Sequence, residues 1–177
     1  MIVGVTGKKG HGKDTVGLFL QEQGFKRTAF AQNLKIAAMQ IFQLAPQQVF
    51  GPISIKEAED PRWGMTPREI MQKLGTEVGR NIHPDVWVKG TMLALEKENA
   101  RNVVITDVRF LNEANAVKEA GGIILRVIRP GFGTDEHNEH ASETEMDGIE
   151  ADYEVLNDGP RLALKEKVVA LGLQEMK

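Results

Sequence analysis

The chain has 177 residues, the length of one domain or of two very small ones. A hydrophobic fraction of 41% excludes a wholly disordered chain, and a formal net charge of −3 does not indicate a general binder of polymeric nucleic acid or of membrane surfaces. Because cysteine is absent, a disulfide framework, a thiolate zinc site and a cysteine nucleophile are excluded. No apolar run approaches the roughly 18 residues that span a bilayer, and residues 1–5 lack a preceding basic region, so we expect a soluble cytoplasmic chain without a signal peptide.

Strand-like and helix-like patterns alternate along the sequence. In chain order, they predict a strand at 2–6, a helix at 14–23, a weaker strand at 25–31, helices at 34–45, from 66 and at about 84–99, a strand at 102–106, a helix at 111–120, strands at 123–128 and 153–156, and a helix at 160–171. Residues 46–65 show no clear period and are predicted as a loop with one short helix. Buried strands separated by helices are typical of a mostly parallel five-stranded sheet with helices on both faces, an α/β architecture that places ligands at the carboxyl ends of its strands.

A glycine-rich segment follows the first predicted strand. Residues 7–14 match the pattern G-x-x-x-x-G-K in their first seven positions, between a strand and a helix as that pattern requires. Such a loop directs backbone N–H groups and the positive end of a helix dipole toward a phosphate. We therefore predict that it binds ATP, with its lysine on the β- and γ-phosphates; a chance glycine-rich turn is the alternative. The predicted ATP ligands in the loop are Gly7, Lys8, Lys9, Gly10, His11, Gly12 and Lys13.

Asp14 stands where this pattern usually has serine or threonine. A carboxylate so close to phosphates would be repelled unless Mg²⁺ lay between them. Asp14 is therefore a candidate ligand of Mg²⁺, directly or through water, and also a candidate ATP contact. The hydroxyl of Thr15, one position later, is the second candidate for both roles.

Several stretches together resemble the phage deoxynucleoside monophosphate kinases, a group related to phosphomevalonate kinase within the P-loop kinases. The end of the glycine-rich loop, Gly12–Thr15, is characteristic of that group. Further matching stretches follow in order at residues 34–35, 68–77, 106–109 with Glu113, 129–131, 140–143 and 157–159. The resemblance implies a three-layer P-loop kinase fold formed as a single domain by residues 1–177, with acceptor-binding helices at about 32–100 and a lid segment at about 131–150.

The resemblance also implies a reaction. The γ-phosphoryl group of ATP would pass to a (deoxy)nucleoside 5′-monophosphate, giving the diphosphate and ADP, with Mg²⁺ as cofactor. Two alternatives stay open: a P-loop kinase for another small phosphorylated acceptor, similar to phosphomevalonate, and a nucleotide-binding switch without transfer activity. The expected partners are small-molecule nucleotides, with no polymeric nucleic acid and no membrane, and a homodimer is also open. We expect the protein to be located in the cytoplasm, which would be the cytoplasm of the host cell if a phage encodes the chain.

The helix predicted from residue 66 begins with a capping box at Thr66 and carries candidate acceptor ligands. Arg68 and Gln72 are four residues apart and share one helix face, with Gly75 and Thr76 a turn later. An arginine fork can bind the acceptor phosphate through two hydrogen bonds, and glutamine can bond the phosphate or the base edge. By spacing alone, a solvated helix face with an ordinary arginine is the favoured alternative; the resemblance favours acceptor binding.

Two further residues are candidate acceptor ligands. Lys35 resembles the acceptor-phosphate lysine of these kinases, with a solvated lysine opposite an apolar helix face as the alternative. Trp87 matches an aromatic-Val-Lys pattern of the group, and its flat ring can stack on the acceptor base. A tryptophan of the core or of an interface is the alternative.

A polar group follows the strand predicted at 102–106. Asp107 can orient Mg²⁺-bound water or accept a hydrogen bond from the acceptor, and Arg109 can clamp the transferred phosphoryl group. We predict both as catalytic, together with Lys13, and Arg109 as an acceptor ligand too; an ion pair at the strand end is the alternative. Glu113 is expected to bond the sugar 3′-hydroxyl, with bracing of Arg109 as the alternative.

Residues 131–150 contain no lysine or arginine but many carboxylates. Their position between two strands predicts a lid that closes over ATP and excludes water. Because this lid supplies no cation, the phosphates would be neutralised by the loop lysines, Arg109, Arg126, Arg129 and Mg²⁺. A solvated acidic loop is the alternative, and a metal cluster of His137, His140 and the surrounding carboxylates is a weaker one.

The resemblance assigns the five remaining site residues. It implies that His140 and Glu143 lie near the acceptor, and that Arg129 contacts ATP. It also implies that the turn containing Asn157 and Gly159 passes the adenine ring with backbone contacts. A tight turn with a helix cap explains that turn equally well.

Overall fold

The computed structural model describes residues 1–132 and 145–175. The chain divides into two compact units. The first, here the core unit, comprises Met1–Ala29 and Leu95–Lys177, and the second, here the inserted unit, comprises Phe30–Ala94. The segment expected to bind the acceptor, about 32–100, falls mostly in the inserted unit.

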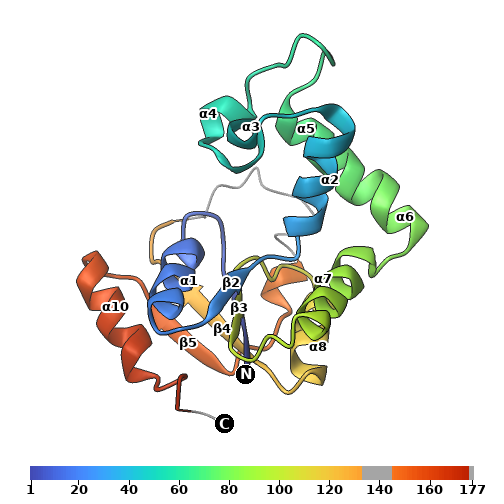
Figure 1. Ribbon diagram of the computed structural model, residues 1–177. Coiled ribbons are helices and arrows are strands. Elements are labelled where there is room, and N and C mark those ends of the chain that lie inside the picture. The colour runs from blue at the N-terminus through green and yellow to red at the C-terminus, as the bar shows by residue number, and fades with distance from the viewer. Residues whose placement is uncertain (133–144, 176–177) are drawn as a thin grey trace. The chain divides into compact units, whose positions relative to one another are not determined.

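The core unit is built on a five-stranded parallel sheet (Figure 1). Its strands are β1 (Ile2–Thr6), β2 (Lys26–Thr28), β3 (Val103–Ile105), β4 (Ile123–Ile128) and β5 (Tyr153–Leu156), in the spatial order β2-β3-β1-β4-β5. The predicted α/β sheet is thereby confirmed. Because β1 is central and β3 and β4 flank it, the segments that follow these three strands emerge at the same edge of the sheet.

Helices cover both faces of this sheet, as expected for three layers. On one face, α1 (Lys13–Glu22) and α10 (Arg161–Ala170) pack against a buried cluster that includes Val3, Val5, Leu125 and Val127. On the other face lies α8 (Leu111–Glu119), where a Cβ added at Gly4 would lie 2.8 Å from Ile124 and 3.3 Å from Val117. Each fully buried large apolar side chain contributes about 1.5–3 kcal/mol, so these contacts fix the strand ends that carry the site.

The inserted unit is helical (Figure 1). Its helices are α2 (Gln32–Phe42), α3 (Pro46–Phe50), α4 (Ile53–Lys56), α5 (Pro67–Gln72), the π-helix η1 (Lys73–Gly79), α6 (Arg80–Ile82) and the start of α7 (Val86–Lys97). Ala38, Leu44, Val49 and Ile70 form its buried cluster. The prediction of one short helix in 46–65 was wrong, because α3 and α4 both lie there. The missed signal is Pro46 at the first helical position.

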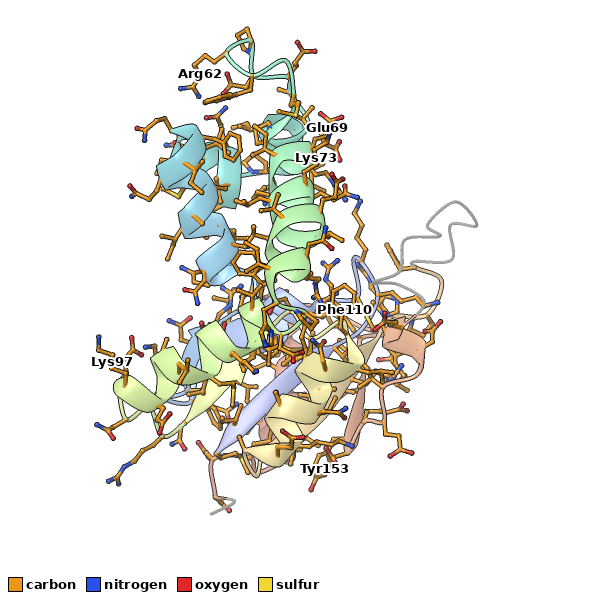
Figure 2. All side chains as sticks on the ribbon, turned by 90° about the vertical axis from the view of Figure 1, so that its right-hand side faces the viewer. Arg62, Glu69, Lys73, Lys97, Phe110 and Tyr153 are labelled. Atoms are coloured by element: carbon orange, nitrogen blue, oxygen red, sulfur yellow. The ribbon has the colours of Figure 1, made fainter. Side chains whose placement is uncertain are left out.

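The capping box predicted at the start of α5 is confirmed. Thr66 Oγ1 accepts a hydrogen bond from the Glu69 N–H at 3.1 Å, and Glu69 Oε2 accepts one from the Thr66 N–H at 2.8 Å. The bond from the Thr66 N–H, followed by one that the Thr66 hydroxyl donates to the same carboxylate, lowers the pKa of Glu69 below its usual value. The two bonds between the backbone of one residue and the side chain of the other form the capping box. They satisfy two N–H groups at the helix start, which fixes the first turn of the helix that carries Arg68. Figure 2 shows Glu69 in this turn.

A buried carboxylate anchors the loop before α5. The Asp60 side chain is 2% exposed; it accepts hydrogen bonds from Arg62 Nη2 at 2.6 Å, from Arg62 Nε at 2.9 Å and from Gln48 Nε2 at 2.9 Å. The Arg62 guanidinium, followed by the Gln48 amide, holds the pKa of Asp60 well below its usual range. Asp60 therefore ties this loop to α3.

The variant Asp60→Asn should have a lower free energy of unfolding than wild type at pH 7, and that free energy should decrease less as the pH is lowered. A carboxyl with a depressed folded pKa contributes stability that is complete well above its unfolded pKa of about 3.9 and is lost as the pH falls toward the folded pKa. The wild-type advantage in urea midpoint should therefore shrink from about pH 5 downward. Glu166→Gln, at an exposed carboxylate of α10, serves as the control. A wild-type advantage that stays constant with pH would contradict this role for Asp60.

Among the residues that the structure describes, no helix is both long enough and apolar enough to cross a membrane.

Candidate active site

The glycine-rich loop lies between β1 and α1, as predicted. Gly7 has φ 138° and Gly12 has φ 101°, left-handed values that favour glycine. Gly12 is the N-cap of α1 and no side chain caps this helix, so its first N–H groups have no side-chain acceptor at the cap. Unsatisfied N–H groups and the helix dipole at this end attract anions. The loop therefore has the backbone geometry of a phosphate site.

Lys13 begins α1 and turns back over the loop. Its Nζ donates to the Gly7 carbonyl at 2.5 Å and to the Lys8 carbonyl at 2.9 Å. Phosphate oxygens would be stronger acceptors for an ammonium group than these neutral carbonyls. The lysine is therefore held at the loop, where a bound phosphate can take over its hydrogen bonds.

Two residues expected to contact ATP use their side chains to hold the loop. The His11 ring is buried, and Asn157 Nδ2 donates to the His11 carbonyl at 3.0 Å. Gly12 allows this approach, because a Cβ there would lie 2.8 Å from Asn157 Nδ2. The side chain of Asn157 is thus used within the protein, and the expected backbone contacts of its turn with adenine remain a prediction. In the same turn, Asp158 forms an ion pair with Lys167 at 2.5 Å.

Asp14 is paired with an arginine that the sequence analysis missed. Arg27 Nη2 lies 2.5 Å from Asp14 Oδ1, and the Asp14 side chain is 81% exposed. Arg27 stands in β2, which contacts α1, and a Cβ added at Gly17 would lie 3.2 Å from Arg27 Nε. Such a contact between distant segments leaves no local sequence signal. The pair offsets the negative charge that Asp14 brings to the phosphate loop.

Asp107 and Arg109 follow β3 directly, next to the loop-bearing strand. Between them, the Val108 N–H donates to the Val5 carbonyl of β1 at 3.2 Å. Glu113 is 4% exposed, and its Oε2 accepts hydrogen bonds from the N–H groups of Arg109 at 2.8 Å and Phe110 at 3.1 Å. Glu113 therefore caps α8 and braces the Arg109 backbone, which favours the alternative over the expected bond to the sugar. Figure 2 labels Phe110 at this cap.

In the inserted unit, the predicted acceptor ligands stand on α5 and η1. Arg68 Nη1 forms an ion pair with Glu57 Oε1 at 2.8 Å, with both side chains about half exposed. Gln72 and Thr76 are exposed, whereas Gly75 is buried. A Cβ at Gly75 would lie 2.8 Å from Leu34. Gly75 is therefore packed within the inserted unit and not exposed beside Gln72, in a stretch where the π-helix replaces α-helical spacing from residue 73. Its role as an acceptor ligand remains a prediction.

Trp87 and Lys35 lie against apolar groups of the same unit. Trp87 Nε1 donates to the Gly75 carbonyl at 2.9 Å, and a Cβ at Gly79 would lie 2.5 Å from the Trp87 ring. Lys35 Nζ lies 5.3 Å from the centre of the Phe50 ring. Trp87 thus has a packing role in the inserted unit, and its stacking on the acceptor base remains a prediction. Lys35 is half-buried rather than fully solvated.

The acidic segment is described only at its two ends. His137, His140 and Glu143 lie outside the described residues, and among the described residues no three histidine or carboxylate side chains gather as a metal cluster. Beyond the gap, Met146 and Ile149 are buried, so this part of the expected polar lid is anchored in the core. The expected cations near the phosphates are partly engaged: Lys8 lies 3.8 Å from Asp147, and Arg126 donates to the Ile149 carbonyl.

The fold and the phosphate loop define a class of protein. The chain matches the shikimate kinase of Aquifex aeolicus with a TM-score of 0.54 at 18% identity, covering 99% of this chain and 96% of that one. It matches the dephospho-CoA kinase of Campylobacter jejuni with a TM-score of 0.53 at 19% identity, covering 98% and 96%. At these identities the likeness shows the fold, which is that of the P-loop kinases.

Sequence relatives narrow the class. A model of the family "Deoxynucleotide monophosphate kinase" matches residues 53–168. The chain is 36% identical over 173 residues to a "Putative deoxynucleotide monophosphate kinase" of Acanthamoeba polyphaga mimivirus, covering 88% of this chain and 86% of the relative. It is 30% identical over 118 residues to the deoxynucleoside-5′-monophosphate kinase of Escherichia phage T5, covering 62% of this chain and 44% of the phage protein. The chain therefore belongs to the deoxynucleotide monophosphate kinase family, and it is an ATP-using nucleotide kinase by class.

Proposed function

We propose that this chain transfers the γ-phosphoryl group of ATP to a deoxynucleoside 5′-monophosphate through the residues of the glycine-rich loop and of the segment after β3. An oxygen of the acceptor phosphate attacks the γ-phosphorus, and the bond from that phosphorus to the β–γ bridging oxygen breaks. The products are ADP and the deoxynucleoside diphosphate. The observation that carries the proposal is the loop at the end of β1, with Lys13 over it, in a chain of this family.

Each core-unit residue has a role that follows from its chemistry. The loop N–H groups and Lys13 hold the β- and γ-phosphates, where charge develops during transfer. Arg109, whose backbone is fixed by Glu113, would neutralise the transferred group. Asp107 would orient the metal hydration shell or the acceptor. Positioning and charge stabilisation of this kind supply most of the catalysis in phosphoryl transfer.

The donors near the loop fit Mg²⁺. This ion is typically held by one or two protein oxygens, by waters and by substrate phosphates, rather than by an all-protein cage. The Thr15 hydroxyl and the Asp107 carboxylate suit that arrangement, and Asp14 would join it only by leaving Arg27. When bound, Mg²⁺ would neutralise charge on the β- and γ-phosphates.

The inserted unit would hold the acceptor. Arg68 offers a guanidinium fork, with Gln72 and Thr76 exposed on the same helical segment and Lys35 as a further cation. The half-exposed ion pair of Arg68 with Glu57 contributes little to stability, so a phosphate dianion can displace Glu57. Arg129, together with the residues of the acidic segment, would complete the nucleotide contacts.

The variant Arg68→Ala should raise KM for the acceptor about tenfold or more and leave KM for ATP unchanged, because a charge-assisted bond to phosphate is lost. Steady-state kinetics with each substrate varied in turn measure this effect. Glu57→Gln is the matched control, since it frees Arg68 without removing it, and should not weaken acceptor binding. An acceptor KM within twofold of wild type in Arg68→Ala would contradict the assignment.

A panel of acceptors tests the function itself. ADP formation should be measured by a coupled assay with each deoxynucleoside monophosphate, the matching ribonucleotides and phosphomevalonate. We expect turnover with at least one deoxynucleoside monophosphate. ADP formed only with a non-nucleotide acceptor would refute the proposal.

A further inference from the structure

The His11 side chain points into the protein although the residue belongs to the phosphate loop. The residue is 7% exposed. Its Nδ1 lies 3.0 Å from the Val127 carbonyl oxygen, near the end of β4, and its Nε2 lies 3.0 Å from the Phe132 carbonyl oxygen. Each ring nitrogen thus lies within hydrogen-bond distance of a backbone carbonyl oxygen, one near the end of β4 and one in the segment that follows it.

Both partners are acceptors only, so the ring must donate. A neutral imidazole donates from one nitrogen and an imidazolium from both, and either form joins the loop to this segment. The backbone of His11 adds a third link, because its carbonyl accepts from Asn157 Nδ2. One loop residue is therefore tied to the segments that follow both β4 and β5.

The Phe132 end of this link includes an arginine. Residues 129–132 form a turn closed by the Phe132 N–H and the Arg129 carbonyl at 3.3 Å, with Gly131 at φ 76°. The Arg129 guanidinium carbon lies 3.7 Å from the centre of the Phe132 ring, in stacking distance. We call these four residues the Arg129 turn. The His11 ring therefore connects the turn that carries the Arg129 guanidinium to the phosphate loop.

We propose that His11 is a positioning residue for ATP binding, which holds the phosphate loop and the Arg129 turn together before ATP arrives. The proposal rests on the proposed function, in which this loop binds ATP. A loop that is already ordered loses less conformational freedom on binding, so its affinity is higher. Without the link, only a fraction of molecules has the loop and Arg129 in place, and the apparent dissociation constant rises by the inverse of that fraction.

The variant His11→Phe keeps a flat ring of similar size and removes both ring nitrogens, and with them every hydrogen bond of the side chain. We expect it to raise the Kd for ATP, measured by calorimetry with Mg²⁺ and without acceptor, by about tenfold, the effect of losing one or two buried hydrogen bonds. The kcat at saturating ATP should stay within about twofold, because ATP binding itself restores the order. His11→Gln can donate to one carbonyl and should give an intermediate Kd, which also tests the proposal if His11→Phe does not fold.

A structural role alone gives a different result. Val168→Ala, in the buried cluster under α10, is the matched control: it should lower Tm without changing the Kd for ATP. If the His11 variants behave in the same way, with lower Tm and unchanged Kd, the proposal is overturned. If the wild-type chain does not bind ATP, both the proposed function and this inference are refuted. If the wild-type chain binds ATP and transfers phosphate while the His11 variants keep the wild-type Kd, only this inference is refuted.

A double-variant cycle tests the connection to Arg129. If His11 acts in part by placing Arg129, the loss of affinity in His11→Phe with Arg129→Ala should be smaller than the product of the two single losses. A double variant whose loss equals that product would show that the two residues act independently and would overturn the link.

Discussion

Replacing Lys13 by alanine should lower kcat/KM by a factor of about 10³. Its Nζ is the cation held at the loop, within 2.5 Å of the Gly7 carbonyl. In transfer, this charge would stabilise the negative charge that develops on the β–γ bridging oxygen and the γ-phosphoryl oxygens. Stability should change far less than activity, by about 1–3 kcal/mol, because the only hydrogen bonds lost are two part-buried ones to loop carbonyls. Steady-state kinetics and thermal unfolding on the same preparations separate the two effects.

Lys9→Ala is the matched control for this variant. Lys9 is an exposed cation in the same loop, so its removal should reduce kcat/KM less than tenfold. A Lys13→Ala variant that kept turnover within tenfold of wild type would remove Lys13 from the reaction, and with it the catalytic role of the loop.

Replacing Gly7 by alanine should abolish measurable ATP binding and lower the free energy of unfolding by about 3 kcal/mol. The residue has φ 138°, and an added Cβ would lie 2.3 Å from the Val127 carbonyl oxygen. Neither atom can move without displacing backbone, and that carbonyl is also a partner of His11. The loop would therefore have to leave β4 and lose its phosphate-binding shape. Calorimetric titration with ATP and urea unfolding measure the two losses.

Alanine substitutions at two other glycines distinguish the effect of backbone strain from the effect of a steric clash. Gly10, in the same loop, has φ 83°, and Gly24, after α1, has φ 91°; nothing lies within 4 Å of an added Cβ at either position. Alanine should cost about 1 kcal/mol of stability at each, from backbone strain alone. Gly24→Ala should leave ATP binding intact. If Gly7→Ala bound ATP as tightly as Gly24→Ala does, the close approach of Gly7 to β4 would have no part in forming the site.

Local sequence signals sufficed for much of the fold. The predicted strands at 123–128 and 153–156 have the observed bounds of β4 and β5. The mostly apolar run of β4 is buried or half-buried throughout, and the edge strand β5 stops at the turn that begins with Asn157, so both strands have clear ends in the sequence. The glycine pattern located the phosphate loop, and the capping box located the start of α5, because each depends on residues close in sequence.

The parts that could not be predicted depend on distant contacts. Nothing near Asp14 in the sequence indicates its pairing with Arg27, and nothing near Arg68 indicates Glu57. The inward direction of the His11 ring depends on two carbonyls more than 100 residues away. Within the π-helix at Lys73–Gly79, Gly75 packs closely on Leu34 and Gly79 on Trp87, and the periodicity of the sequence does not reveal these contacts.

The most direct test is ³¹P NMR of the wild-type chain with Mg²⁺, ATP and a deoxynucleoside monophosphate. The account predicts that signals of ADP and of the deoxynucleoside diphosphate grow together in equal amounts, while inorganic phosphate stays at its starting level. Release of inorganic phosphate without any diphosphate of the acceptor, or an unchanged spectrum with every deoxynucleoside monophosphate, would contradict it.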